Sequence, residues 1–199
     1  MSEQKIDSGK RTWIIASGCA GALGAGFVAV PFVSSFEPSE RARAAGAPVE
    51  VDISGIKPGE KLTVEWRGKP VWIVRRTPEQ LAELPKVDKE LGDPMSKRDN
   101  FSTTPEFARN DWRSLKPEYL VVVGICSHLG CSPGDKFTPG AQPSLPDDWA
   151  GGFLCPCHGS TFDMAGRVYK DKPAPDNLEV PPYTYLTDSR LLIGEEKKA

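Results

Sequence analysis

A long apolar run stands near the start of the chain. No charged residue occurs between Thr12 and Val33. As a helix rising about 1.5 Å per residue, this run of about 22 residues would extend about 33 Å, which matches a hydrocarbon core of about 30 Å. A cleaved signal peptide is the alternative, with a small-x-small site at 42–44, but signal-peptide apolar regions span only about 7–15 residues. The run therefore predicts a retained transmembrane helix over residues 12–34.

The charges around this run indicate its orientation. Lys5, Lys10 and Arg11 precede it, and this positive charge favours a cytoplasmic N-terminus over residues 1–11. Lys10-Arg11 is also a weakened form of a twin-arginine export signal. Export of a domain that is already folded would suit a cofactor that is inserted before translocation.

A polar segment and then strand-like patterns follow the apolar run. Residues 35–50 are polar and Ala-rich without an apolar face, which predicts a flexible hinge or, alternatively, an inert spacer. Residues 51–199 have the pattern of a β domain, with a helix start at Thr77 and mostly loop between 125 and 178. The predicted strands lie at 49–53, 61–66, 71–75, 119–125, 178–186 and 191–194.

Composition narrows the class of protein. The chain has 199 residues and a formal net charge of −2. That length allows one domain of ordinary size together with an anchor. The near-neutral charge argues against nucleic acid as a partner, because phosphate binding needs an excess of Lys and Arg. With 19 Gly and 19 Pro, the domain after the anchor is expected to be rich in turns.

The Cys and His residues are concentrated in two short clusters. Both histidines and all but one of the five cysteines lie in Cys126-Ser127-His128-Leu129-Gly130-Cys131 and Cys155-Pro156-Cys157-His158-Gly159-Ser160. These six potential ligands exceed the four that one zinc ion or one 2Fe–2S cluster needs. The economical solution takes one Cys and one His from each cluster as ligands and joins the two remaining cysteines in a disulfide.

The motifs C-S-H-L-G-C and C-P-C-H-G-S resemble the two signature boxes of Rieske iron–sulfur proteins. The anchor, the hinge and the segment 173–175 extend the likeness to the Rieske subunits of bacterial ubiquinol–cytochrome c reductases. The resemblance implies an all-β Rieske domain, an antiparallel β sandwich with a loop-rich cluster-binding subdomain at about 120–176, tethered to one N-terminal transmembrane helix.

The resemblance also implies the ligands of one 2Fe–2S cluster. It makes Cys126 and Cys155 the ligands of the buried iron, and His128 and His158 the ligands of the outer iron. The two cysteines that remain would form a disulfide, which agrees with the ligand count and indicates an oxidising compartment. The family pattern assigns this disulfide to Cys131 and Cys157.

Neighbouring residues receive supporting roles. Gly130 and Gly159 lack a Cβ and so allow close backbone approach and N–H donation to sulfur. Leu129 is expected to shield the cluster and to offer an apolar contact to a partner, with plain packing as the alternative. In the respiratory branch, the Ser at position 160 and a Tyr two residues later donate hydrogen bonds that raise the potential. Because Phe162 has no hydroxyl here, we expect a lower potential and a lower-potential quinone pool.

The resemblance implies a function in the respiratory chain. Quinol would give one electron and one proton at His158, with His128 beside it, and the head domain would move on its hinge to deliver the electron to a c-type haem. The implied partners are cytochrome b and c-type cytochrome subunits, ubiquinol and membrane lipid, within a dimeric complex. The implied location is the bacterial inner membrane, with the head domain in the periplasm.

Two other interpretations are weighed against this one. A structural zinc module is disfavoured because the spacing differs from paired C-x-x-C knuckles and because the surplus of ligands is unexplained. A Rieske subunit of another enzyme, such as arsenite oxidase, or the ferredoxin of an aromatic-ring dioxygenase would use the same two motifs. A soluble ferredoxin would lack the apolar run, and the haem or molybdenum content of the purified assembly distinguishes the others.

Overall fold

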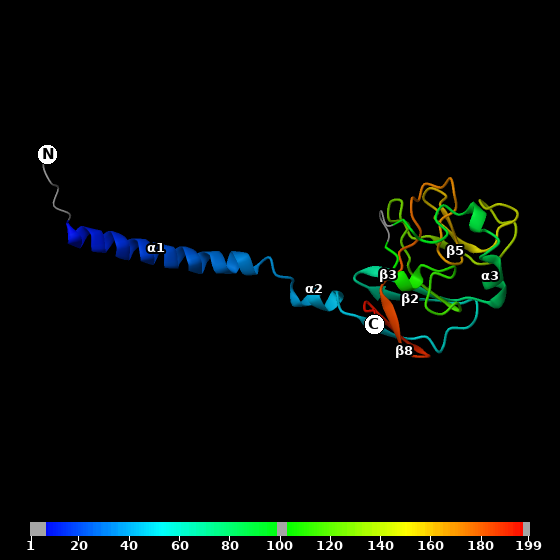
Figure 1. Cartoon of the computed structure of the whole chain (residues 1–199), viewed down its shortest axis with the longest axis horizontal. Helices are drawn as coiled ribbons and strands as arrows, with labels where there is room; N and C mark the ends of the chain where they lie inside the picture. Colours follow the sequence, from blue (N-terminus) through cyan, green and yellow to red (C-terminus); the bar gives the residue numbers. More distant parts are fainter. Residues whose placement is uncertain (1–6, 99–102, 197–199) are drawn as a thin grey trace. The chain divides into compact units, whose positions relative to one another are not determined.

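The computed structural model describes residues 7–98 and 103–196. The chain divides into two units, Met1–Ala44 and Ala45–Ala199, which are taken here one at a time (Figure 1). The second unit is called the head domain below.

The first unit consists of helix α1 (Ser8–Ser34), a short connection and most of helix α2 (Glu40–Ala45). The side chain of Asp7 caps α1 by accepting from the backbone N–H groups of Gly9 and Lys10. The helix therefore begins at Ser8, ahead of the predicted apolar span 12–34. An apolar window in α1 has a mean hydropathy of 1.8, and the helix is long and apolar enough to cross a membrane.

The described residues of the head domain form three antiparallel sheets of three strands each. The first has the order β1-β9-β8, the second β2-β3-β4 and the third β5-β6-β7. Their bounds are β1 Val49–Asp52, β2 Lys61–Trp66, β3 Lys69–Arg75, β4 Tyr119–Val123, β5 Gly134–Lys136, β6 Gly152–Leu154, β7 Thr161–Asp163, β8 Tyr183–Thr187 and β9 Arg190–Ile193. The predicted all-β antiparallel fold class is confirmed.

The local signals of the sequence explain several of these elements. Strands β2 and β3 form the predicted hairpin, in which Arg67 and Gly68 both have positive φ, as a two-residue hairpin turn requires. Helix α3 (Pro78–Glu83) begins with the predicted capping box between Thr77 and Gln80. Two short 3₁₀ helices, η1 (Asp88–Glu90) and η2 (Glu106–Ala108), follow in the irregular part of the chain.

Two predicted regions differ most from the structure, while other strands differ by one or two residues at an end. The region between 125 and 178 is not only loop, because it contains β5, β6 and β7, each of three residues. Such short strands give no period that the sequence reveals. The predicted strand 178–186 is shorter at its start, since β8 begins at Tyr183, after Pro181 and Pro182, which have no backbone N–H to donate.

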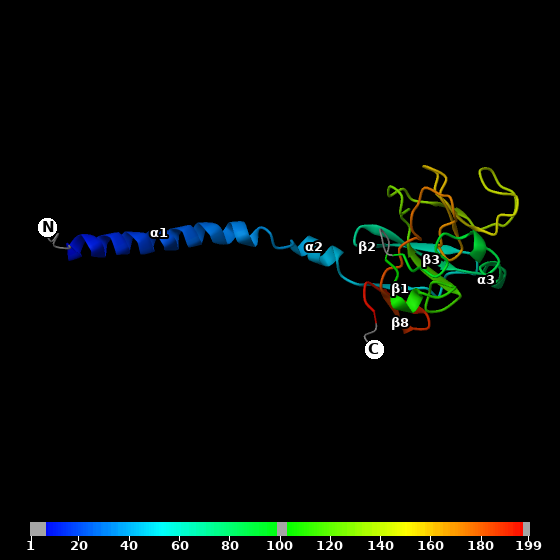
Figure 2. The same ribbon diagram turned by 45° about the horizontal axis from the view of Figure 1, so that its top comes forward.

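The buried core extends from the second sheet into the third. All five residues of β4 are buried, as are Val71–Val74 of β3, which matches their continuous apolar sequence. Phe153 of β6 and Phe162 of β7 join the same core. In both views the yellow and gold loops around the third sheet lie at the end of the head domain opposite β8 (Figures 1 and 2).

Three fully buried arginines hold the turn after β7. Arg76 donates to the carbonyl of residue 164, and Arg113 donates to those of residues 165 and 166. Arg167 forms an ion pair of 2.7 Å with Asp163. Burial lowers the pKa of both Arg76 and Arg113 to about 10, so each remains charged at neutral pH. These three arginines were not predicted from the sequence.

Candidate metal centre

The first Cys/His loop, Cys126–Cys131, directly follows β4. The N–H of Cys126 donates to the carbonyl of Cys131 at 2.8 Å, and the N–H of Gly130 donates to the carbonyl of Cys126 at 3.1 Å. Gly130 has a φ of 82°, a conformation that glycine adopts without strain. The six-residue loop is therefore closed by its own backbone.

The second loop, Cys155–Ser160, has the same closure. The N–H of Cys155 donates to the carbonyl of Ser160 at 2.8 Å, and the N–H of Gly159 donates to that of Cys155 at 3.0 Å. Gly159 has a φ of 75° at the position that Gly130 occupies in the first loop. The glycines thus have a conformational reason in addition to the expected close approach.

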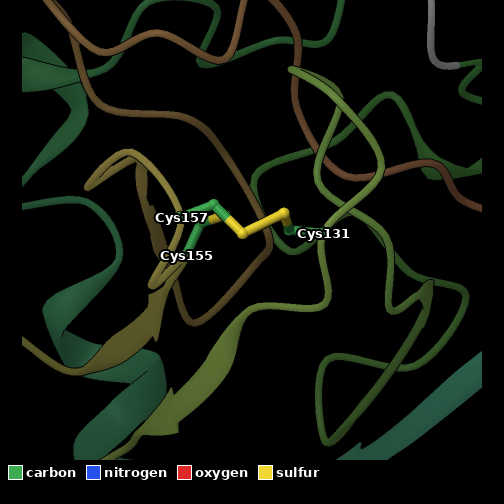
Figure 3. Close-up of side chains that lie close together, drawn as sticks. All are labelled: Cys131, Cys155 and Cys157. Atoms are coloured by element: carbon green, nitrogen blue, oxygen red, sulfur yellow. A yellow bond between two sulfur atoms is a disulfide. The ribbon is translucent and has the colours of Figure 1, made fainter.

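A disulfide joins Cys131 of the first loop to Cys157 of the second. The prediction of this pair is confirmed. Figure 3 shows Cys155 beside the bridge, and the sulfur atoms of these three cysteines lie within 4.8 Å of one another.

The two remaining thiols of the loops lie deeper. Cys126 and Cys155 are free and each is only 2% exposed. Burial raises the pKa of the Cys126 thiol to about 11, while the backbone N–H of His128 and the hydroxyl of Ser160 act in the opposite direction by hydrogen bonding. The neighbouring Cys155 adds to this rise in the pKa of Cys126. The structure therefore brings together the two cysteines expected to bind one iron.

The imidazoles of His128 and His158 meet on the outer side. Their ring centroids are 4.7 Å apart with an interplanar angle of 86°. His128 is half-buried, whereas His158 is exposed. Two buried thiols and two outer imidazoles from separate loops fit the donor set of a cluster with two cysteine and two histidine ligands.

The segment 173–175 and its neighbours connect the two loops. The Ser160 hydroxyl accepts from the N–H of Ala174 at 3.0 Å. The Ser127 hydroxyl donates to the carbonyl of Asp176 at 2.7 Å. Ser160 was predicted from the sequence and Ser127 was not, although the hydroxyl of Ser127 lies inside the C-S-H motif. One segment is thus hydrogen-bonded to both loops.

Other predicted site residues differ in exposure. Leu129 is 72% exposed, so it is not a packing residue of the head domain. Gly130 and Gly159 are also exposed. Phe162 is fully buried, opposite Phe153 in the pairing of β7 with β6.

Comparison with known proteins agrees with this geometry. The Rieske [2Fe-2S] domain family matches residues 48–183, and the family described as "Ubiquitinol-cytochrome C reductase Fe-S subunit TAT signal" matches residues 13–39. The ubiquinol-cytochrome c reductase iron-sulfur subunit of Allochromatium vinosum is 53% identical over 99% of this chain and 94% of its own length. The subunit of the same name from Bradyrhizobium diazoefficiens is 40% identical over 90% of each chain.

A solved structure is also similar. A chain of a hyperthermophilic respiratory Complex III is 28% identical with a TM-score of 0.45, covering 91% of this chain and 98% of that one.

The fold and the two-loop site define a Rieske-type 2Fe–2S protein with an N-terminal apolar helix. More narrowly, the chain belongs to the family of ubiquinol–cytochrome c reductase iron–sulfur subunits. This membership favours the respiratory interpretation over a zinc module and over a Rieske subunit of another oxidoreductase.

Proposed function

We propose that Cys126, Cys155, His128 and His158 hold one 2Fe–2S cluster, through which the chain takes one electron from ubiquinol and passes it to a c-type haem. The observation that carries this proposal is the approach of two imidazoles from separate loops, 4.7 Å between ring centroids, in loops that each also hold one buried free thiol. Two thiolates on one iron and two imidazoles on the other are the ligand set of Rieske centres.

The histidines provide the proton chemistry. When bound, the cluster exchanges one electron at a potential of about −150 to +300 mV. Each imidazole has two nitrogens, so one can bind metal while the other holds a proton. His158 is the more exposed ring and is our candidate for the hydrogen bond to quinol, with His128 beside it. A quinol hydroxyl that donates to the free nitrogen of His158 can leave its proton there.

The surrounding residues orient the ligands and limit access of water. The disulfide and the segment 173–175 hold the two loops against each other. Leu129, which directly follows His128 in the first loop, is exposed and offers an apolar contact beside that histidine. A partner that covers Leu129 would exclude water from the site and would strengthen the hydrogen bond at His158.

The proposed partners are cytochrome b and a c-type cytochrome within a dimeric complex, together with ubiquinol and membrane lipid. Helix α1 would anchor the chain in the bacterial inner membrane with its N-terminus cytoplasmic and the head domain periplasmic. The length and hydropathy of α1, together with the match of residues 13–39 to an export-signal family, support this placement. Proton translocation would be a property of the whole complex.

The connection between the two units is the proposed hinge. It contains the six-residue helix α2, and its last two residues, 49 and 50, already belong to β1. Head movement predicts that proline substitutions at Ala44 and Gly46 slow turnover of the membrane complex and leave the spectrum of the cluster unchanged. Equal turnover in the substituted and unsubstituted complexes would contradict movement on this segment.

The ligand assignment is tested in the full chain purified from membranes. Cys126→Ser and His158→Ala are expected to lose bound iron and the electron paramagnetic resonance signal of the reduced cluster. Cys19→Ser is the matched control, because Cys19 is a free cysteine on α1, and it should retain both. A wild-type protein that is colourless and contains zinc in place of iron would refute the proposal, since zinc gives no such signal.

A further inference from the structure

Each ligand-bearing loop is preceded by a short segment, called its stem here: residues 124–125 before the first loop and 153–154 before the second. Both stems contact one buried side chain, Trp72 of β3. In the first stem, Gly124 stands two residues before Cys126, and a Cβ at Gly124 would overlap the Trp72 indole, closer than the 3.0 Å that Cβ atoms keep. In the second stem, Phe153 stands two residues before Cys155, and its ring stacks on Trp72 with centroids 5.2 Å apart and an interplanar angle of 17°. Trp72 itself is 3% exposed.

The glycine in the first stem is required by space and not by backbone conformation. Gly124 is not among the residues with positive φ, so its φ does not require glycine. Its N–H donates to the carbonyl of Pro70 at 2.8 Å, which fixes this backbone beside β3. The indole therefore lies directly against the main chain that leads into Cys126.

The indole is fixed by further contacts. Trp72 pairs with Thr63 of β2 and Val122 of β4 in the middle of the second sheet. The Lys61 ammonium lies 4.3 Å from the Trp72 ring centroid and forms an ion pair of 2.5 Å with Asp135. Asp135 of β5 is paired with the second-stem residue Phe153 of β6. Lys61 thus links the sheet that carries Trp72 to the sheet that carries the second loop.

We infer that Trp72 is a positioning residue that sets the separation of the two ligand loops from their inner side. The disulfide Cys131–Cys157 joins the loops at one place, and Trp72 separates their stems at another. Because the core is close-packed, replacing or displacing the Trp72 ring forces the two stems to shift. The inference rests on the proposed function, since it concerns the ligands of the cluster.

The experiment compares Gly124→Ala, Trp72→Phe and the double variant in the assembled membrane complex. The readouts are the g-values of the reduced cluster, its midpoint potential and the iron bound per chain. Gly124→Ala should shift the g-values and the potential and lose iron, because the new methyl group displaces the indole. Trp72→Phe alone should shift them as well, because the stems lose their spacer.

The double variant should restore the wild-type g-values in part. The added methyl group overlaps the Nε1, Cε2 and Cζ2 atoms of the indole, and replacement of the indole by the smaller phenyl ring leaves room for it. A residue that served only overall stability would instead give additive losses of stability with unchanged g-values in the molecules that keep a cluster.

Two controls match these substitutions. Gly55→Ala adds a methyl group where nothing lies within 4 Å. Trp66→Phe shortens another buried Trp of the same hairpin, which contacts Gly194 and Arg67. Both should leave the g-values unchanged.

The outcomes separate this inference from the proposed function. Wild-type protein without iron or the reduced signal would refute the proposed function. A normal wild-type signal with Trp72→Phe indistinguishable from it would refute the role of Trp72 alone, whether or not Gly124→Ala accumulates as folded protein.

Discussion

Removal of the disulfide should destabilise the head domain by an amount that the loop length predicts. The bridge joins Cys131 and Cys157, which are 26 residues apart. In the chain-entropy description, closing a loop of 26 residues lowers the entropy of the unfolded chain. At 25 °C this stabilises the folded state by about 3.5 kcal/mol. For a domain of this size, each kcal/mol of lost stability lowers Tm by about 2–4 °C. Loss of the disulfide should therefore lower Tm by about 7–14 °C.

The double variant Cys131→Ser, Cys157→Ser in the full chain tests this value, since removing both cysteines leaves no unpaired thiol at the bridge. Tm is followed by the loss of visible absorbance of the cluster at a fixed heating rate. Cys19→Ser, which removes a free cysteine from α1, is the control and should leave Tm unchanged. A decrease of less than about 2 °C would show that closure of the loop is not what stabilises the site.

Three further results are expected. Phe162→Tyr should raise the midpoint potential if the hydroxyl reaches a cluster sulfur, and a redox titration without an upward shift would contradict the expected effect of the missing donor. Arg113→Met leaves the carbonyls that Arg113 serves without a donor and should lower the free energy of unfolding by at least about 3 kcal/mol in denaturant titrations. Arg190→Met, which breaks an exposed ion pair, should cost under about 1 kcal/mol, and equal losses would refute the argument from burial. Ser127→Ala removes both hydrogen bonds between Ser127 and Asp176 and should speed proteolytic cleavage of the segment 173–176, and unchanged cleavage would contradict that attachment.

The two loops could be identified from the sequence because their chemistry is rare. Both histidines of the chain lie within them, so composition alone directs attention to the site. The apolar runs of α1 and β4 were equally visible, because both faces of β4 are buried and α1 is long and apolar. These features depend on neighbouring residues in the sequence, which is why local patterns predict them.

The supports of the site could not be predicted in this way. Arg76 and Arg113 are charged and would be expected at the surface, yet both are buried in the core, where they donate to carbonyl oxygens far away in the sequence. The contact of Trp72 with Gly124 depends on how β3 and β4 pair. Such packing depends on the assembled fold and leaves no periodic trace in the sequence.

The two loops share one backbone frame, and their side chains are what differ. In each, the first N–H donates to the sixth carbonyl, and the fifth residue is a glycine with positive φ that donates back to the first carbonyl. In this frame His128 occupies the third position and His158 the fourth, while the bridging cysteines Cys131 and Cys157 occupy the sixth and the third.

This offset of side chains determines which groups meet. Each loop is closed by its own hydrogen bonds, so its internal shape does not depend on the other loop. The disulfide joins the sixth residue of the first loop to the third residue of the second, and in this arrangement the His128 ring lies against the His158 ring. How the two loops are joined and spaced therefore determines how the four proposed ligands lie, so the residues between the loops matter as much as the proposed ligands themselves.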